Sequence, residues 1–364
     1  VTFDMTGLPP TSEEMAQFEQ DQRPEAYEQT VDRLLRSPQF GVRWGRHWLD
    51  IVGYTDTVSF DEDFGAPIGF LDGKWRYRDY VIDAFNADKP YDQFVLEQLA
   101  GDELVDWRNA TEYSPEIIEK LVATGFLRTA EDISVEDPRP FVIWSTVHET
   151  LEQTATSLLG VTLQCARCHS HKFEPIPQRD YYSLMALFTP ALNPQNWKNA
   201  RNRLLPDVAA PVLAEIQKHN GEIDRQVGEV QQQIDAVRRG YEQKLREEKL
   251  QAIPEPIRAD LKAALDLPAD KQDVVQKYLV GKLGPLVKIE PAAIDAALNA
   301  TDRERLQQQS QQIADLNGKK RTHGWIHSVY DVGPPPAAQI FKRGEFETPG
   351  RAVPPGFLRV LSDP

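Results

Sequence analysis

Cysteine is nearly absent from this sequence, and its two cysteines, Cys165 and Cys168, lie only three positions apart. A network of stapling disulfides is therefore excluded. No apolar run approaches the roughly 20 residues that a membrane-spanning helix needs. Basic residues are outnumbered, with 41 Lys and Arg against 56 Asp and Glu, which gives a net charge of −15. Because that sign is wrong for binding a phosphate backbone, we expect no nucleic-acid partner.

The chain begins at Val1 within what reads as folded sequence, without an initiator Met or a signal peptide. We therefore expect a mature or cut piece of a longer protein, with further parts on both sides. At 364 residues it exceeds what one hydrophobic core usually organises, so we expect two or three structural units. Helical patterns dominate and predict a mainly α fold.

We assign residues 1–205 to one helical domain. A helix is predicted over about 40–52, and its buried residues are predicted to be Trp44, Trp48, Leu49 and Val52, with His47 in the same turns. A long helix from Phe141 runs toward the two cysteines, and Gly160 is the position that could interrupt it.

Residues 206–320 have the pattern of a coiled-coil hairpin. Apolar residues spaced by four and three form a narrow seam: Ile216, Ile223, Val227, Val230, Ile234, Val237 and Tyr241. A weaker stripe follows at Leu306, Ile313 and Leu316. We predict an antiparallel hairpin with a helical insert over 252–299 at its tip. Residues 321–364 are rich in Pro and Gly and predict an extended strap, or a linker to a domain beyond this sequence.

The run Cys165-Ala166-Arg167-Cys168-His169 has the C-x-x-C-H spacing of c-type haem attachment. Two thiols one helical turn apart can each form a thioether with the vinyl groups on one edge of a porphyrin, and the next residue then ligates the iron. We therefore predict one covalent haem c, with His169 as the proximal iron ligand.

Two other uses of the cysteines are weighed against haem. Cys165, Cys168, His169 and His171 are all zinc-ligand types, but a structural zinc site normally draws its ligand pairs from two separated segments. A thioredoxin-like dithiol expects the pair at the start of a helix that follows a strand. Here a long predicted helix precedes the pair, so haem is the favoured reading.

The sixth iron position has two candidates, His47 and Met185. His47 could ligate the iron or act as a distal catalytic base, and a buried core histidine is the alternative. Met185 lies in an apolar stripe, where a plain core role is the alternative. His148 precedes His169 by 21 residues, about 31 Å along a straight helix, and is out of reach unless Gly160 breaks that helix.

Polar residues around the motif have expected supporting roles. We expect His171 to form hydrogen bonds or to line a haem propionate. Arg167 is expected to offset propionate charge, as could Arg76 and Arg78, with surface salt bridges as the alternative.

Residues 56–73 lack periodicity and are predicted to form an acidic loop. Asp56, Asp61 and Asp63 could hold Ca²⁺ there, although the ligand register and glycine of an EF-hand are missing. A solvated acidic loop is the favoured alternative.

Six motifs together resemble the planctomycete-type cytochrome c-like proteins, a secreted group of otherwise unknown function. They occur in family order at residues 3–10, 44–50, 75–80, 90–94, 98–102 and 165–175, and the resemblance covers about residues 1–190. Arg343-Gly344 and Pro349-Gly350 resemble the junction before that family's usual C-terminal domain. The resemblance implies a haem-bearing module, often preceded by another cytochrome-like domain, in which Cys165, Cys168 and His169 are the haem residues.

We therefore expect an exported or periplasmic c-type cytochrome domain that transfers electrons to a redox partner protein or an adjacent cytochrome domain. Export follows because covalent haem attachment is performed outside the cytoplasmic membrane. One alternative is a haem-dependent oxidoreductase with an open iron site, in which His47 handles protons on a polysaccharide-derived substrate. Another is a scaffold whose haem is structural and whose coiled coil binds a partner.

Overall fold

The computed structural model describes residues 1–59, 68–129 and 138–362. It is mainly helical, as the sequence predicts, and divides into two compact units. Unit 1 comprises Val1–Leu213 with His323–Pro364, and unit 2 comprises Ala214–Thr322.

Unit 1 is built from helices and three pairs of short strands. Its helices before the motif are α1 (Thr2–Thr6), α2 (Ser12–Gln20), α3 (Ala26–Leu35), α4 (Pro38–Ile51), α5 (Trp75–Asn86), α6 (Tyr91–Ala100), α7 (Pro115–Ala123) and α8 (Pro140–Leu159). Strands β1 (Thr57–Ser59) and β2 (Ile68–Phe70) pair antiparallel, where the sequence predicted only a loop.

Helix α4 packs closely against α5 because glycines occupy part of the contact. A Cβ at Gly41 would collide with the carbonyl oxygen of Ile82. The buried stripe of α4 therefore runs through Gly41, Gly45 and Trp48, and the buried C-cap residue Val52 continues it. The predicted burial of Trp44 is wrong: its side chain is 41% exposed, because it lies one position outside this stripe.

Helix α8 ends sharply before the two cysteines. Gly160 adopts the left-handed conformation (φ 64°), and its N–H donates to the carbonyl oxygen of Thr156, which closes the helix. The chain then turns back and forms α9 (Gln164–Cys168) and α10 (Gln178–Phe188). The predicted long helix is therefore interrupted at Gly160, and α8 does not run straight into the motif.

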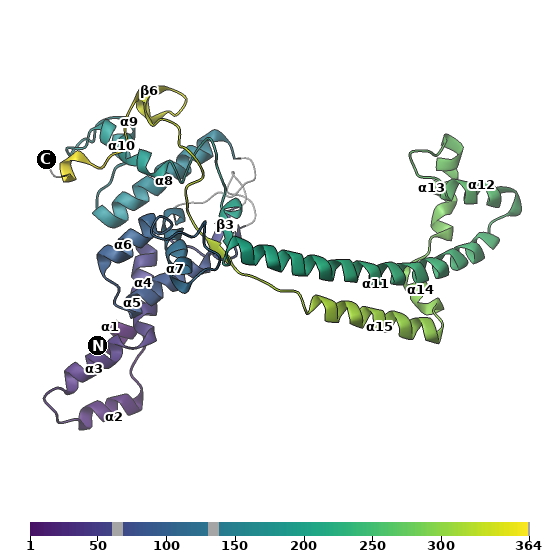
Figure 1. Ribbon diagram of the computed structural model, residues 1–364, viewed down its shortest axis with the longest axis horizontal. Coiled ribbons are helices and arrows are strands. Elements are labelled where there is room, and N and C mark those ends of the chain that lie inside the picture. The colour runs from purple at the N-terminus through teal and green to yellow at the C-terminus, as the bar shows by residue number, and fades with distance from the viewer. Residues whose placement is uncertain (60–67, 130–137, 363–364) are drawn as a thin grey trace. The chain divides into compact units, whose positions relative to one another are not determined.

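The C-terminal segment is part of unit 1. Strand β4 (Trp325–His327) pairs antiparallel with β3 (Leu204–Pro206), and β5 (Gln339–Phe341) pairs with β6 (Pro349–Ala352). Ile326, Phe341 and Leu358 are buried. The segment therefore contributes to the core of unit 1, unlike the separate strap expected over 321–364. Figure 1 shows β6 beside α9 and α10.

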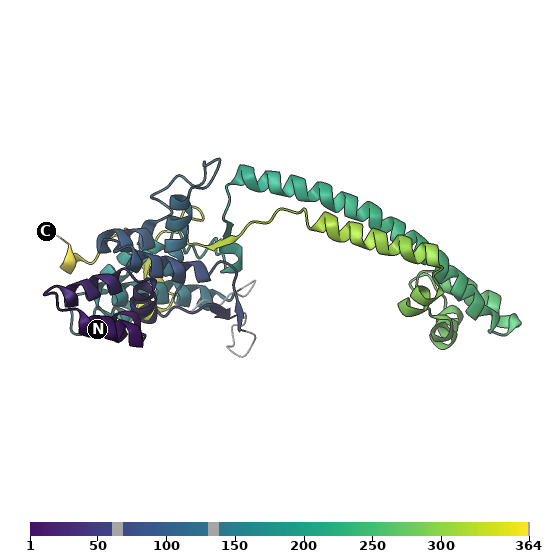
Figure 2. The ribbon, with the colours of Figure 1, turned by 90° about the horizontal axis from the view of Figure 1, so that it is seen from below.

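Most of α11 (Ala210–Gln251) belongs to unit 2, where it pairs antiparallel with α15 (Ala300–Asn317), as the seam predicts. Asn220 bonds to Arg321, Gln309 to Gln233 and Tyr241 to Asp302, so residue numbers rise on one helix as they fall on the other. Figures 1 and 2 both show α15 alongside α11. The insert contains α12 (Glu255–Leu265), α13 (Val274–Val287) and α14 (Pro291–Ala297).

Candidate functional site

The two thiols lie on the exposed side of α9. Residues three apart on a helix share a face, and Cys165 and Cys168 are both free and exposed. Ala166, on the opposite side, is fully buried and anchors the short helix in the core of unit 1. The local structure thus presents both sulfur atoms in the same direction.

An open groove of about 420 Å³ lies beside the thiols. Arg167, Arg343, Gly344 and Glu345 line it together with the two cysteines and Gln164. Its volume falls in the range of roughly 300–1,000 Å³ that is usual for cofactor pockets. Its two arginines are suited to carboxylate groups on a bound molecule.

The wall opposite α9 has unusual backbone geometry. Arg343 (φ 56°) and Gly344 (φ 77°) both adopt the left-handed region, which costs free energy for a residue other than glycine. A Cβ on residue 344 would lie 2.8 Å from the Sγ atom of Cys168. Glycine is therefore required for this close approach to the thiol.

The two histidines after the thiols are held in different tautomers. His169 Nδ1 lies 2.7 Å from the carbonyl oxygen of Ser170, which can only accept, so Nδ1 carries the proton and Nε2 keeps a free lone pair. His171 Nδ1 instead accepts hydrogen bonds from the backbone N–H groups of Phe173 and Glu174, at 3.3 and 2.9 Å. Neutral His171 therefore carries its proton on Nε2. His169 can ligate a metal, whereas His171 is a hydrogen-bond donor.

Hydrogen bonds fix the end of α9. The side-chain amide of Gln178 donates to the carbonyl oxygens of Arg167 (3.0 Å) and Phe341 (3.2 Å). The hydroxyl of Tyr182 donates to the same Arg167 carbonyl at 2.9 Å. These bonds join α9, α10 and β5 and hold the motif in position.

A buried polar network lies behind α9. His148 Nδ1 is 2.8 Å from the hydroxyl of Tyr181, which donates to the carboxylate of Glu152 at 3.3 Å. His148 is 1% exposed, and its Nε2 has no hydrogen-bond partner among the described residues. Burial, reinforced by the charge of Arg167, lowers the pKa of His148 to about 3. Burial also raises the pKa of Glu152.

The sequence analysis set His148 aside because a straight helix would carry it away from the motif. The break at Gly160 removes that condition, and His148 lies within electrostatic range of Arg167. When Tyr181 donates to Glu152, its oxygen accepts from Nδ1–H of His148, which leaves the lone pair on Nε2. Metal-binding histidines are commonly oriented by such a hydrogen bond on the other ring nitrogen.

The two candidates for the sixth position lie in different places. Met185 is buried in the core on α10, which packs against α9. His47 is exposed on α4, with its ring centroid 5.4 Å from that of Trp44. Figure 1 shows α4 and α9 apart within unit 1. Among the described contacts, none joins His47 to the groove.

The other charged candidates have partners within the protein. Arg76 pairs with Asp207, and Arg78 pairs with Asp56. Asp61 and Asp63, the other proposed Ca²⁺ ligands, lie outside the described residues. Across residues 1–59, 68–129 and 138–362, no group of three His, Cys, Asp or Glu side chains is arranged to hold a metal ion.

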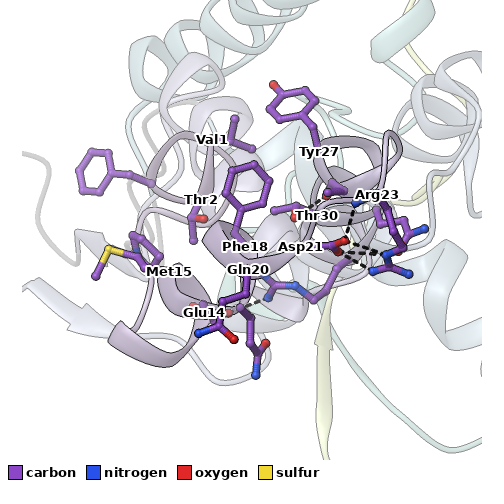
Figure 3. A pocket seen from close by; sticks show the side chains of 16 residues that line it. Val1, Thr2, Glu14, Met15, Phe18, Gln20, Asp21, Arg23, Tyr27 and Thr30 are labelled. Carbon is purple, nitrogen blue, oxygen red and sulfur yellow. Dashed lines mark hydrogen bonds and ion pairs between the residues drawn. The ribbon is translucent and has the colours of Figure 1, made fainter.

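A larger groove of about 850 Å³ lies among α1, α2 and α3 (Figure 3). Apolar side chains such as Phe18 and Met15 line it. Its charged groups pair with each other, Glu14 with Arg33 and Asp21 with Arg23. The groove among α1, α2 and α3 has no cysteine or histidine in its lining. The groove at α9 is therefore the better candidate for a chemical site.

Unit 1 is a mainly helical domain that carries two free cysteines three positions apart. A comparison with protein-family models matches residues 1–192 to the family described as PSCyt2, protein of unknown function (DUF1549). This is more than half of the chain, which therefore belongs to this planctomycete cytochrome-like family. The resemblance found in the sequence is confirmed. Comparisons with curated proteins and with solved structures found no match.

Within the described residues, no helix has the length and apolar character needed to cross a bilayer. This agrees with the absence of a long apolar run in the sequence.

Proposed function

We propose that unit 1 is an exported c-type cytochrome domain that transfers electrons within a larger multi-domain redox protein. The observation that carries this proposal is the presentation of the motif: two free thiols face the same groove, and His169 keeps its Nε2 lone pair available. A bound haem would supply one-electron exchange at its iron.

The residues of the site fit that group. Cys165 and Cys168 would each add their S–H across one vinyl group, with sulfur bonded to one carbon and hydrogen to the other. His169 would ligate the iron through Nε2. Arg167 and Arg343 line the groove and would supply positive charge to offset propionate carboxylates, and His171 would offer an Nε2–H donor. His148 joins His47 and Met185 as a candidate for the sixth position.

A haem-dependent oxidoreductase acting on a polysaccharide-derived substrate is the second candidate. Its open iron site is consistent with the placement of His47 on the surface of α4, away from the groove, but that placement gives no support to His47 as the group that handles protons there.

The proposal is tested by producing the protein in cells with a haem-attachment system. We expect one haem per chain, seen as a mass increment that survives denaturation, and colour that survives acid–acetone extraction. Cys165→Ser with Cys168→Ser should abolish both, whereas His47→Ala should leave the attachment intact. Colour that leaves with the solvent, or one zinc ion per chain, contradicts the proposal.

Spectra of the attached haem separate the two functions. Low-spin reduced protein that does not bind carbon monoxide supports an electron carrier. Rapid binding of carbon monoxide supports the enzyme. His148→Leu, Met185→Leu and His47→Ala identify the sixth ligand, because only loss of the true ligand converts a low-spin spectrum to high-spin.

A further inference from the structure

Helix α13 is apolar on both sides. Its inner side contributes to the small core of the insert through Leu279, Leu283 and Val287. Its outer side presents four large apolar side chains with exposures of 85, 66, 64 and 60%, which are Val274, Val275, Tyr278 and Leu286. A helix that contacts water normally has one apolar side, so the outer side of α13 has the composition of a contact surface.

The same surface is basic in an acidic chain. Three lysines, Lys277, Lys282 and Lys288, lie between Val274 and Ile289, and no acidic residue does, although the chain carries a net charge of −15. All three lysines are exposed.

The two acidic residues that flank this stretch are already engaged. The Asp273 carboxylate accepts a hydrogen bond from the backbone N–H of Gln276 and caps the helix. Glu290 pairs with Lys288 at 2.9 Å. Asp273 keeps its charge as a cap, and Lys288 and Glu290 offset each other. The stretch 273–290 therefore has a net charge of +1, from three lysines against two carboxylates.

Lysines and apolar side chains are interleaved along the helix. Val274, Tyr278, Lys282 and Leu286 are spaced by four and therefore share one strip. A lysine in such a strip can lay its methylene chain along an apolar surface while its ammonium group stays in a polar layer. A tyrosine ring is suited to the same boundary.

We propose that the outer side of α13 binds the surface of an anionic lipid bilayer, with the helix lying in the plane of the interface. Exposed apolar side chains can enter the boundary layer of a bilayer while the lysines among them contact anionic headgroups. The helix has 14 residues, about 21 Å, which is too short to span the hydrocarbon core but long enough to lie on it. Self-association through this side is disfavoured, because a two-fold interface sets the same lysines against each other.

Vesicle flotation of the full chain tests the proposal. The protein should float with phosphatidylcholine vesicles that contain phosphatidylglycerol, float much less with pure phosphatidylcholine, and be released by salt. Lys277→Gln and Lys282→Gln should each lower the partition coefficient about fivefold. Val275→Ser with Tyr278→Ser should lower it about tenfold or more. These residues are exposed, so the fold should be unchanged by circular dichroism.

Tyr91→Ser on α6 is the matched control, because Tyr91 is 61% exposed, close to Tyr278. Equal loss in this control, or no flotation with anionic vesicles, overturns the proposal. Dimerisation in light scattering that Val275→Ser with Tyr278→Ser abolishes, without vesicle binding, shows that the surface contacts protein instead. The Cys165→Ser, Cys168→Ser protein should float equally, which separates this test from that of haem binding.

Discussion

Acidification should destabilise unit 1 through His148. Burial lowers the pKa of this side chain to about 3, whereas an unfolded histidine titrates near 6.5. Between these values the unfolded chain binds a proton that the folded chain does not. The free energy of unfolding must therefore fall as the pH falls from about 6.5 toward 3.

The expected size follows from the pKa difference. At about pH 4.5, two units below the unfolded pKa, the loss attributable to His148 is about 2.7 kcal/mol relative to pH 7.5. Glu152 and Asp102 act in the opposite direction, because burial raises their pKa and the folded protein binds protons more readily there. Only the difference between wild type and a His148 variant isolates the effect.

Urea unfolding followed by tryptophan fluorescence measures this difference. All seven tryptophans lie in unit 1, so the signal reports that unit alone. The background carries Cys165→Ser and Cys168→Ser, since a bound haem would quench the fluorescence. Between the two pH values, the free energy of unfolding of the His148→Leu variant should fall by about 2.7 kcal/mol less than that of this background. The His47→Ala variant should show the same fall as the background. Equal losses with and without His148 would refute the reasoning, because they would mean that the buried ring is protonated as easily as a solvated one.

Two shorter predictions concern the core and the hairpin. Burial and the neighbouring charge of Asp331 raise the pKa of Asp102 to about 6, so Asp102→Asn should stabilise unit 1 at about pH 7.5 by up to about 3 kcal/mol. This gain in the free energy of unfolding should vanish near pH 4 in the same urea assay. An equal gain at both pH values would contradict the raised pKa of Asp102. Replacing unit 2 (Ala214–Thr322) by a short Gly/Ser linker should leave the fluorescence midpoint and haem attachment unchanged, because Asp207 and Gly324 hydrogen-bond to each other beside the excision. Loss of either property would show that unit 1 needs the hairpin.

The helices were predictable from the sequence because their information is local. Apolar spacing predicts the seam of α11, and Val230 and Ile234 do pack there against Leu306. Trp44 is exposed, although the spacing of large apolar residues predicts its burial. Gly41 and Gly45 carry no apolar side chain, yet they form the contact with α5 and decide which side of α4 is buried.

The C-terminal segment was harder to place for a different reason. Its Pro and Gly content predicts extended backbone, and extended backbone is what β4, β5 and β6 contain. Composition does not say whether such a segment packs or projects. Whether the segment packs depends on a few apolar side chains, such as Ile326 and Phe341, which are buried in a core formed mostly by residues much earlier in the chain.

In the candidate site, some residues could be placed from local sequence and others could not. Cys165, Cys168 and His169 form one contiguous motif, so their arrangement follows from a single helical turn. His148 could not be placed without knowing whether Gly160 ends α8, and the signal was a glycine followed by an apolar residue, Val161, which is typical of a helix end. The N–H of Val161 does donate to the carbonyl oxygen of Ala155 at 3.4 Å. The 21 residues between His148 and His169 therefore give a distance only if the helix between them is unbroken. Because Gly160 adopts the left-handed conformation and ends α8, the buried His148 lies within electrostatic range of Arg167 in the motif.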